Sequence, residues 1–231
     1  MEQNKTDWDK YYQKPYITAR YSRRISRDRF FRFLKKYVPR SEWGSLRVAE
    51  LGGAGSCYYD YIQKQLSPER YIIIDNNRTG LQMMEEKIKG KDNVDLLDMD
   101  VLEFDGKMEL DLVYSIGLIE HFPLRERQKV IQVHFDLLKP GGIAILSFPT
   151  PTFLYLITRW LSKMLNLWIW HDEIPLEVND VIQLMKPFGA VKETKILWPM
   201  ILTQAMIVVQ KFHLKGDSAP NPGCHVAEWQ N

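Results

Sequence analysis

Short apolar runs alternate with amphipathic segments through most of this 231-residue chain, and that alternation limits the folds it can adopt. Runs such as Tyr71–Ile74 and Ile143–Ser147 contain almost no polar residues, which is typical of strands buried on both faces. Such strands, when they alternate with helices, form a parallel sheet covered on both sides. The predicted strands are 47–51, 71–74, 94–97, 110–114 and 143–147, and the predicted helices are 17–38, 58–66, 81–88, 125–138 and 178–188.

The last two predicted strands, 191–197 and 205–210, break this alternation. Seven residues separate them, too few for a crossover helix, so the two strands should pair antiparallel. The expected fold is α/β, a Rossmann-like, doubly wound and mostly parallel sheet that ends in an antiparallel β-hairpin. A dinucleotide-binding half would continue to alternate, so this ending argues against a nucleotide-dependent oxidoreductase.

Composition places the chain among globular proteins and excludes few partners. Hydrophobic residues make up 45% and charged residues 26%, and the formal net charge of +2 does not suit a general polyanion binder. Two cysteines cannot build a disulfide framework, and the N-terminus lacks the apolar segment of a signal peptide, so a cytoplasmic location is expected. No uninterrupted apolar run reaches the roughly 18 residues that a membrane span requires.

Basic residues are concentrated before the first predicted strand. Residues 1–47 contain thirteen Lys and Arg against five acids. We predict a basic helical N-terminal arm over 1–45, a main domain over 46–213 with a helical insert at about 151–176, and a flexible tail over 214–231. The arginines of the arm (Arg20, Arg23, Arg24 and Arg27) form either a solvated face or a phosphate contact. Nucleic acid is disfavoured as a partner, because no recognisable binding module accompanies them.

Ligands of open α/β sheets bind beyond the carboxyl ends of the strands, so the residues that follow each strand are the candidates for a site. The first strand leads into a glycine turn, Glu50-Leu-Gly-Gly-Ala-Gly55, in which the backbone can approach a ligand without a Cβ in between. Aligned on Gly52 or on Gly53, the turn lacks the third glycine of the dinucleotide motif, and it is not a P-loop. It is therefore a simple strand-to-helix connection or a site for another kind of nucleoside.

Acidic residues follow the second and third strands. Asp75 lies 23 residues after Gly52, where its carboxylate can accept from both hydroxyls of a ribose or can cap the next helix. Asp100-Val101 combines an acid with an apolar side chain, which suits the amino group and ring of an adenine. Of the two acids after the third strand we expect Asp100 to bind and Asp98 to be solvated.

Five segments contain these motifs in a fixed order: Val48–Gly55, Ile74-Asp75, Asp98–Val101, Asp111–His121 and Leu137–Gly142. In order and spacing they resemble the motifs of the class I S-adenosylmethionine-dependent methyltransferases over roughly residues 46–148. The resemblance implies the seven-stranded fold of that family, with S-adenosylmethionine as methyl donor and S-adenosylhomocysteine as product. It also implies an in-line SN2 displacement of an activated methyl group, for which the protein supplies positioning and a site poor in water.

The resemblance assigns roles to the residues at the strand ends. The cofactor-binding residues that it implies are Glu50, Gly52, Gly53 and Gly55 for the methionine part, Asp75 with the adjacent Asn76 for the ribose, Asp100 and Val101 for the adenine, and Ser115 and Ile116 after the fourth strand. Tyr11 or Tyr12 of the arm is expected to close over the cofactor. The chain departs from the family's pattern at Gly53, where many members have Cys, and at Ser56-Cys57, where a further Gly often occurs.

Two histidines are candidates for a general base, because imidazole titrates near neutral pH. His121 follows the fourth strand, where it can instead cap a helix end or pack on the sheet. His171 opens a His-Asp-Glu run in the segment where this superfamily inserts acceptor-binding elements, and the alternative is a surface loop. A hydroxyl acceptor needs such a base, whereas a neutral amine does not. No spacing of Cys and His indicates a metal site.

Residues 153–170 are predicted to form an amphipathic helix. One face of its helical wheel carries Leu154, Ile157, Trp160, Leu161, Met164, Leu165 and Trp168, and the other carries Arg159, Ser162, Lys163 and Asn166. Packed on the domain, this helix would be a lid over the acceptor. Alternatively its Trp and basic residues would make a peripheral membrane contact.

The function expected from the sequence is S-adenosylmethionine-dependent O- or N-methylation of a small or partly apolar acceptor. The alternative is a non-catalytic protein that binds S-adenosylmethionine or S-adenosylhomocysteine. Neither the acceptor nor the oligomeric state follows from the sequence.

Overall fold

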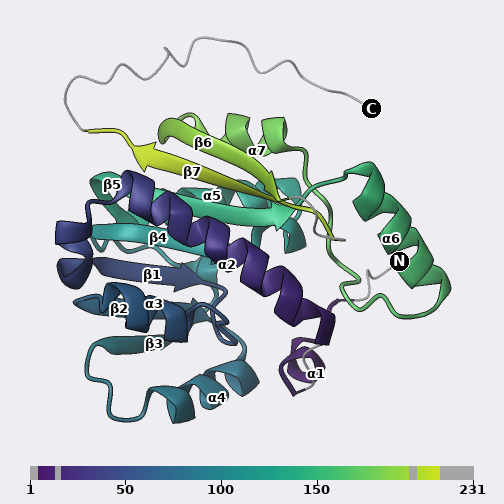
Figure 1. Ribbon diagram of the computed structural model, residues 1–231, viewed down its shortest axis with the longest axis horizontal. Coiled ribbons are helices and arrows are strands. Elements are labelled where there is room, and N and C mark those ends of the chain that lie inside the picture. Colours follow the sequence, from purple (N-terminus) through teal and green to yellow (C-terminus); the bar gives the residue numbers. More distant parts are fainter. Residues whose placement is uncertain (1–4, 14–16, 198–201, 214–231) are drawn as a thin grey trace.

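A computed structural model describes residues 5–13, 17–197 and 202–213, and the side chains of these residues apart from 13 and 17–22. Seven strands form one mixed sheet in the order β3-β2-β1-β4-β5-β7-β6 (Figure 1). The strands are β1 (Arg47–Leu51), β2 (Arg70–Asp75), β3 (Val94–Asp98), β4 (Leu110–Ile116), β5 (Leu138–Pro149), β6 (Gly189–Leu197) and β7 (Gln204–Lys211). The first five are parallel, and β7 pairs antiparallel with both β5 and β6, as predicted.

Helices cover both faces of the sheet (Figure 1). They are α1 (Trp8–Gln13), α2 (Ile17–Tyr37), α3 (Tyr59–Leu66), α4 (Arg78–Ile88), α5 (Leu124–Leu137), α6 (Phe153–Met164) and α7 (Val178–Met185), with short 3-10 helices η1 (Arg40–Ser45), η2 (Val101–Glu103) and η3 (Ile119–His121). On one face, Phe30 of α2 packs against Tyr58 and Tyr114. On the other, apolar residues of α5 and α7 form a second core with β4, β5 and β7.

The strand order reverses at β1, which pairs with β2 on one side and with β4 on the other. The carboxyl ends of β1 and β4 therefore lie next to each other, at the place where ligands of such sheets bind. The chain uses a left-handed backbone there: Gly52 has φ of +71°, and a Cβ on it would lie 2.8 Å from Leu118 Cδ1. The turn after β1 thus packs directly against the turn after β4.

Three predicted boundaries need correction. The helix predicted over 153–170 ends at Met164, because Asn166 takes φ of +52° and the chain turns back to bury Trp168. The strand predicted over 143–147 is longer, since β5 begins at Leu138 and ends at Pro149, and its pairing with β4 is irregular between Leu110 and Leu112. The helix predicted over 178–188 ends at Met185.

Two further findings concern the predicted tail and the lengths of the helices. The predicted tail over 214–231 lies outside the described residues. In the part of the chain that the structure describes, no helix is long and apolar enough to cross a membrane.

Candidate active site

The glycine turn after β1 is crowded by side chains rather than open. A Cβ on Gly53 would lie 2.7 Å from Glu50 Cγ, and a Cβ on Gly55 would lie 2.2 Å from Tyr12 Cε1. The turn therefore tolerates no side chain at either position, and Tyr12, rather than Tyr11, packs on it. The expectation that the arm closes over this turn agrees with that contact.

Glu50 is almost completely buried beneath the turn, with 4% of its surface exposed. Its Oε2 atom accepts hydrogen bonds from the hydroxyls of Tyr71 and Tyr114, the latter at 2.7 Å. Burial raises the pKa of Glu50, and the hydroxyl donors oppose that rise only in part. The two tyrosines fix one end of the predicted cofactor site from below, and nothing in the motif had indicated them.

Asp75, at the end of β2, joins the glycine turn to the start of α4. Its Oδ2 accepts from the Ala54 amide at 2.9 Å and its Oδ1 from the Asn77 amide at 2.8 Å. The N-cap of α4 is Asn77, whose side chain accepts from Gly80, so the capping role considered for Asp75 belongs to Asn77. The Asn76 amide also bonds to this carboxylate, so three of its roughly four lone-pair sites are used and one remains for a ribose hydroxyl.

The residues predicted to hold an adenine gather beside Asp75. Asn76 Nδ2 donates to Asp100 Oδ2 at 3.1 Å, and Asp100 caps η2 through the Leu102 amide. Val101 is 7% exposed and packs in the second core. Asp98 is half-exposed and pairs only with Arg78, at 3.2 Å, which agrees with the solvated role expected for it.

Ser115 and Ile116 at the end of β4 occupy different environments. Ser115 is fully buried, and its Oγ bonds with His134 Nε2 at 2.9 Å in the core beneath α5. Burial lowers the pKa of His134 to about 4, so this imidazole is neutral near pH 7. The Ser115 side chain therefore faces the core, whereas Ile116 is partly exposed at the sheet edge. The Ser115 Oγ is already bonded to His134, which the sequence did not indicate.

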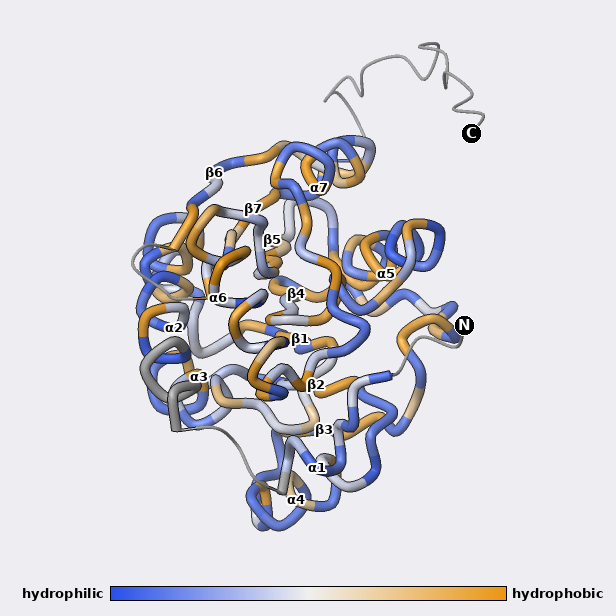
Figure 2. The backbone as a smooth tube through the Cα atoms, turned by 90° about the vertical axis from the view of Figure 1, so that its right-hand side faces the viewer, coloured by the Kyte–Doolittle hydropathy of each residue, from blue (hydrophilic) through white to orange (hydrophobic). Residues whose placement is uncertain are grey.

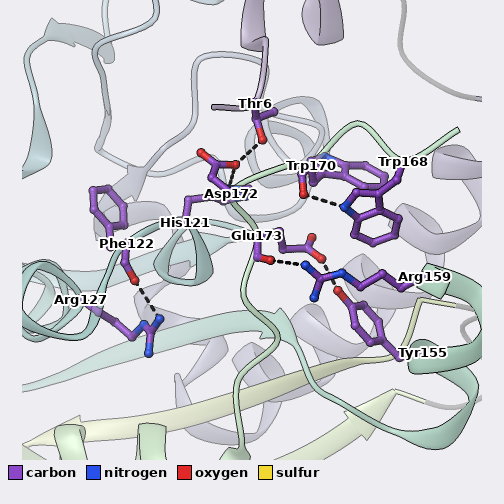
Figure 3. Close-up of polar contacts among 10 residues, drawn as sticks. All are labelled: Thr6, His121, Phe122, Arg127, Tyr155, Arg159, Trp168, Trp170, Asp172 and Glu173. Atoms are coloured by element: carbon purple, nitrogen blue, oxygen red, sulfur yellow. Dashed lines mark hydrogen bonds and ion pairs between the residues drawn. The ribbon is translucent and has the colours of Figure 1, made fainter. Parts of the chain in front are cut away.

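His121 pairs with Asp172 at the end of β4 (Figure 3). The distance from His121 Nδ1 to Asp172 Oδ1 is 2.9 Å, and the Thr6 hydroxyl donates to the same carboxylate oxygen. Burial alone would lower the pKa of His121, but the bond to Asp172 and the nearby carboxylates raise it overall. Burial would raise the pKa of Asp172, yet the His121 and Thr6 bonds lower it to about 2. The pair is thus a histidine oriented by an ionised carboxylate.

Two further carboxyl groups lie next to this pair. Glu120 is 2% exposed, its Oε2 has no hydrogen-bond partner among the described residues, and burial raises its pKa to about 8. Glu173 accepts from the Tyr155 hydroxyl, and Arg159 Nη2 donates to the Glu173 carbonyl at 2.7 Å (Figure 3). Donor atoms of Glu120, His121 and Glu173 lie within 4.8 Å of one another, so these groups could hold a divalent cation.

Helix α1 connects the two halves of the site. The Trp8 ring lies 4.9 Å from the His121 ring, edge to face, and 6.2 Å from the Tyr12 ring. Tyr11 lies 6.3 Å from Trp170, and its hydroxyl accepts from Arg23 Nη2 at 2.6 Å. One short helix therefore covers both the glycine turn and the His121–Asp172 pair.

The arginines of the arm do not share one solvated face. Arg23 bonds to Tyr11, and the Arg27 guanidinium lies 4.4 Å above the centre of the Tyr61 ring. Arg24 is exposed, and the Arg20 side chain lies outside the described part of the arm. At least two of the four arginines thus hold the arm in place.

Of the two candidate bases, the structure brings only His121 into the cluster. His171 is exposed in the turn next to Asp172. The run 171–173 was informative because its two acids, rather than its histidine, join the site. Thr6, Trp8, Glu120 and Tyr155 were missed, because their partners are distant in sequence and no local spacing reveals them.

Comparison with known proteins agrees with this geometry. Residues 48–142 match a family described as a methyltransferase domain, and this segment includes the turns after β1, β2, β3 and β4. This segment of the chain is similar to a methyltransferase domain. A solved structure of magnesium protoporphyrin IX methyltransferase contains S-adenosylmethionine, the cofactor that the sequence predicts for this chain.

The chain is similar to a curated protein from rice (Oryza sativa subsp. japonica), 2-methyl-6-phytyl-1,4-hydroquinone methyltransferase 2, chloroplastic. The two are 29% identical over 129 residues, which are 54% of this chain and 34% of the rice protein. The match thus spans about a third of the length of that relative.

Solved structures of methyltransferases share the fold of this chain. Magnesium protoporphyrin IX methyltransferase (ChlM) from Synechocystis PCC 6803, with bound S-adenosylhomocysteine, has a TM-score of 0.65 at 15% identity, over 88% of this chain and 92% of that one. The N-methyltransferase NodS from Bradyrhizobium japonicum WM9 has a TM-score of 0.60 at 13% identity, over 82% of this chain and 97% of that one. At these identities the likeness concerns the fold.

Proposed function

We propose that this protein methylates a hydroxyl group on a bulky, partly apolar acceptor, with S-adenosylmethionine as donor and His121 as general base. The observation that carries the proposal is the 2.9 Å pairing of His121 with Asp172 next to the glycine turn. Support for the acceptor class comes from the names of two similar proteins, which act on a phytyl hydroquinone and on a magnesium porphyrin.

The residues at the sheet edge fit the cofactor. Glu50 and Tyr12 already lie against Gly53 and Gly55, so a ligand at this turn would contact Tyr12 as well as the backbone. Asp75 retains an acceptor site for a ribose hydroxyl, and Asp100 with Val101 offers an acceptor and an apolar surface for the adenine. When bound there, S-adenosylmethionine supplies a methyl group on a positively charged sulfur, which a nucleophile displaces in line.

The His121–Asp172 pair suits removal of a proton from the acceptor. Ionised Asp172 accepts a hydrogen bond from His121 Nδ1, so the proton of neutral His121 stays on Nδ1. His121 Nε2 is then left to accept the proton of the hydroxyl. The Thr6 hydroxyl holds the Asp172 oxygen in place through a hydrogen bond, and the Trp8 ring packs edge to face against the His121 ring. The acceptor oxygen would then bond to the methyl carbon while the carbon–sulfur bond breaks, S-adenosylhomocysteine would leave, and the hydroxyl proton would pass to His121 Nε2.

A metal-assisted alternative rests on Glu120, His121 and Glu173. We favour the base, since a cation would also need Glu120 as a ligand and burial holds Glu120 neutral near pH 7. A neutral carboxyl group is a poor ligand for a divalent cation. Turnover after treatment with EDTA distinguishes the two mechanisms, and its loss with recovery on adding Mg²⁺ would favour the cation.

The test is turnover of phenols and quinols with long alkyl or isoprenoid chains, measured as release of S-adenosylhomocysteine. The expected result is turnover by the wild type and a loss of about a hundredfold or more in His121→Ala. His171→Ala is the matched control, because that exposed histidine lies two residues from Glu173 but outside the cluster. Equal activity of the wild type and His121→Ala would exclude the base, and binding without turnover of any acceptor would favour the non-catalytic alternative.

A further inference from the structure

Helix α6 and the turn after it expose an unusual amount of apolar surface. Phe153 is 80% exposed, Trp160 62% and Met164 63%. Most of the large exposed hydrophobic residues in the described part of the chain come from this one segment; they are Phe153, Leu154, Leu156, Ile157, Trp160, Leu161, Met164, Leu165 and Leu167. Monomeric proteins rarely expose contiguous apolar patches of this kind without a partner.

The exposure follows from how α6 is attached. Phe153, Leu156, Ile157, Trp160, Leu161 and Met164 recur at helical spacing and share one face. The opposite face holds Tyr155, which is fully buried, and Arg159, which bonds to the Glu173 carbonyl. The helix is thus anchored by an aromatic and a basic residue and presents its apolar face outward. The predicted packing of that face on the domain as a lid is not what the structure shows.

The position of α6 makes this face accessible to a large, flat partner. Figure 1 shows α6 standing away from the sheet at one end of the molecule, and Figure 2, which faces that end, shows the hydrophobic colouring of this region. The turn after the helix extends the same surface through Leu165 and Leu167, which are 59% and 58% exposed.

Charge distinguishes the kinds of partner. Residues 151–170 contain no Asp or Glu, and their two basic residues are Arg159, turned toward the domain, and Lys163, exposed beside the apolar face. An apolar face with Trp near its centre and Lys at its flank is the composition of helices that lie in the headgroup region of anionic bilayers. A second copy would bring two Lys163 side chains and two such faces together with no acid on α6 to pair with them.

We propose that α6 docks this protein on the surface of an anionic lipid bilayer, with Phe153, Trp160 and Met164 inserted among the lipids. The same helix reaches the candidate site from its other side, through Tyr155 and Arg159 at Glu173. A protein docked in this way holds the His121–Asp172 pair close to the membrane surface, from which an apolar acceptor can enter. The docking itself does not depend on the proposed methyl transfer.

Co-sedimentation of the full chain with vesicles of phosphatidylcholine, with and without phosphatidylglycerol, tests the proposal. We expect binding to the anionic vesicles and an at least tenfold lower partition coefficient for Trp160→Glu. Leu124→Glu is the matched control, because Leu124 is 59% exposed on α5, and it should bind like the wild type. Lys163→Glu should weaken binding to the anionic vesicles and have little effect on the neutral ones.

Two measurements make the outcome decisive. Thermal stabilisation by S-adenosylhomocysteine shows that Trp160→Glu is folded, and it reports on the proposed function separately from docking. Light scattering gives the oligomeric state. No pelleting with anionic vesicles, or an equal loss in Leu124→Glu, would overturn the proposal. A wild-type dimer that Trp160→Glu converts to monomers, without vesicle binding by either, would assign the face to a second copy instead.

Discussion

Asp75 is the residue on which cofactor recognition is predicted to depend. Its carboxylate accepts from three backbone amides and retains an acceptor site for one ribose hydroxyl. Hydrogen bonds to a charged group contribute about 1.5–3 kcal/mol each, so Asp75→Ala should weaken S-adenosylhomocysteine binding by roughly tenfold to a hundredfold. Isothermal titration calorimetry measures this, with Asp98→Ala as control. Unchanged affinity in Asp75→Ala would contradict the assigned site.

The His121–Asp172 pair predicts a pH dependence. Asp172 stabilises the imidazolium and raises the pKa of His121, so kcat/KM should rise with pH and level off above an inflection higher than 6.5. In Asp172→Asn the favourable charge is lost, so the inflection should move to lower pH. The plateau should also fall, because the amide no longer fixes the imidazole proton on Nδ1. A pH–rate profile with the inflection unmoved in Asp172→Asn would argue against the pair.

The buried His134 predicts acid sensitivity of the fold. Its pKa of about 4 in the native state lies below the value of 6.5 expected in the unfolded chain, so between these values only the unfolded chain binds the proton. The contribution of a neutral His134 to stability is therefore present above pH 6.5 and lost as the pH falls toward 4, by about 3 kcal/mol in total.

Urea unfolding at pH 7 and pH 4.5 tests this, with His134→Gln as the comparison. Gln does not titrate, so the variant should lose less stability on acidification than the wild type does. Buried Glu120 changes stability in the opposite direction, and the difference between the two proteins removes its contribution. Parallel pH dependences of the two proteins would show that His134 is solvated.

At the scale of elements, the contact between α1 and the glycine turn predicts a coupled pair of substitutions. A Cβ on Gly55 would lie 2.2 Å from the Tyr12 ring, so Gly55→Ala should displace α1 and weaken S-adenosylhomocysteine binding. In a Tyr12→Ala background the same change should cost much less. Calorimetry on the four proteins of the cycle gives the coupling. Gly44→Ala, where nothing lies within 4 Å, is the control, and additive effects would mean that α1 does not cover the turn.

The strands and the antiparallel pairing of the last two were predictable from sequence, whereas the relation between distant segments was not. Buried strands such as β1 and β2 are apolar runs bounded by polar or glycine residues, and a local pattern is sufficient to place them. The outward-facing stripe of α6 was visible as an amphipathic helix, but its orientation depends on Tyr155 and Arg159 finding Glu173, a tertiary contact.

The same distinction applies to the candidate site. The acids Asp75 and Asp100 were found because each directly follows a strand, and a parallel sheet brings such positions together. The pairing of His121 with Asp172 joins residues 51 apart across an insert, so no periodicity could indicate it. Choosing between His121 and His171 required the fold.

At the scale of the whole molecule, the site joins segments from most of the chain, so occupancy should stabilise all of it. A ligand that binds only the native state at a hundred times its Kd adds about 2.7 kcal/mol to the free energy of unfolding. For a domain of this size each kcal/mol raises Tm by roughly 2–4 °C, so S-adenosylhomocysteine should raise it by about 5–10 °C. Differential scanning calorimetry measures the shift.

Two controls show whether the shift in Tm reports binding of S-adenosylhomocysteine at the predicted site. Asp75→Ala should need roughly tenfold to a hundredfold more ligand for the same shift, because the shift depends on the ratio of ligand concentration to Kd. NAD⁺ at the same concentrations should leave Tm unchanged, because the turn over Gly52–Gly55 lacks the third glycine, which allows close packing of helix on strand in the dinucleotide motif. Stabilisation by NAD⁺ in place of S-adenosylhomocysteine would show instead that the carboxyl edge of this sheet binds a dinucleotide.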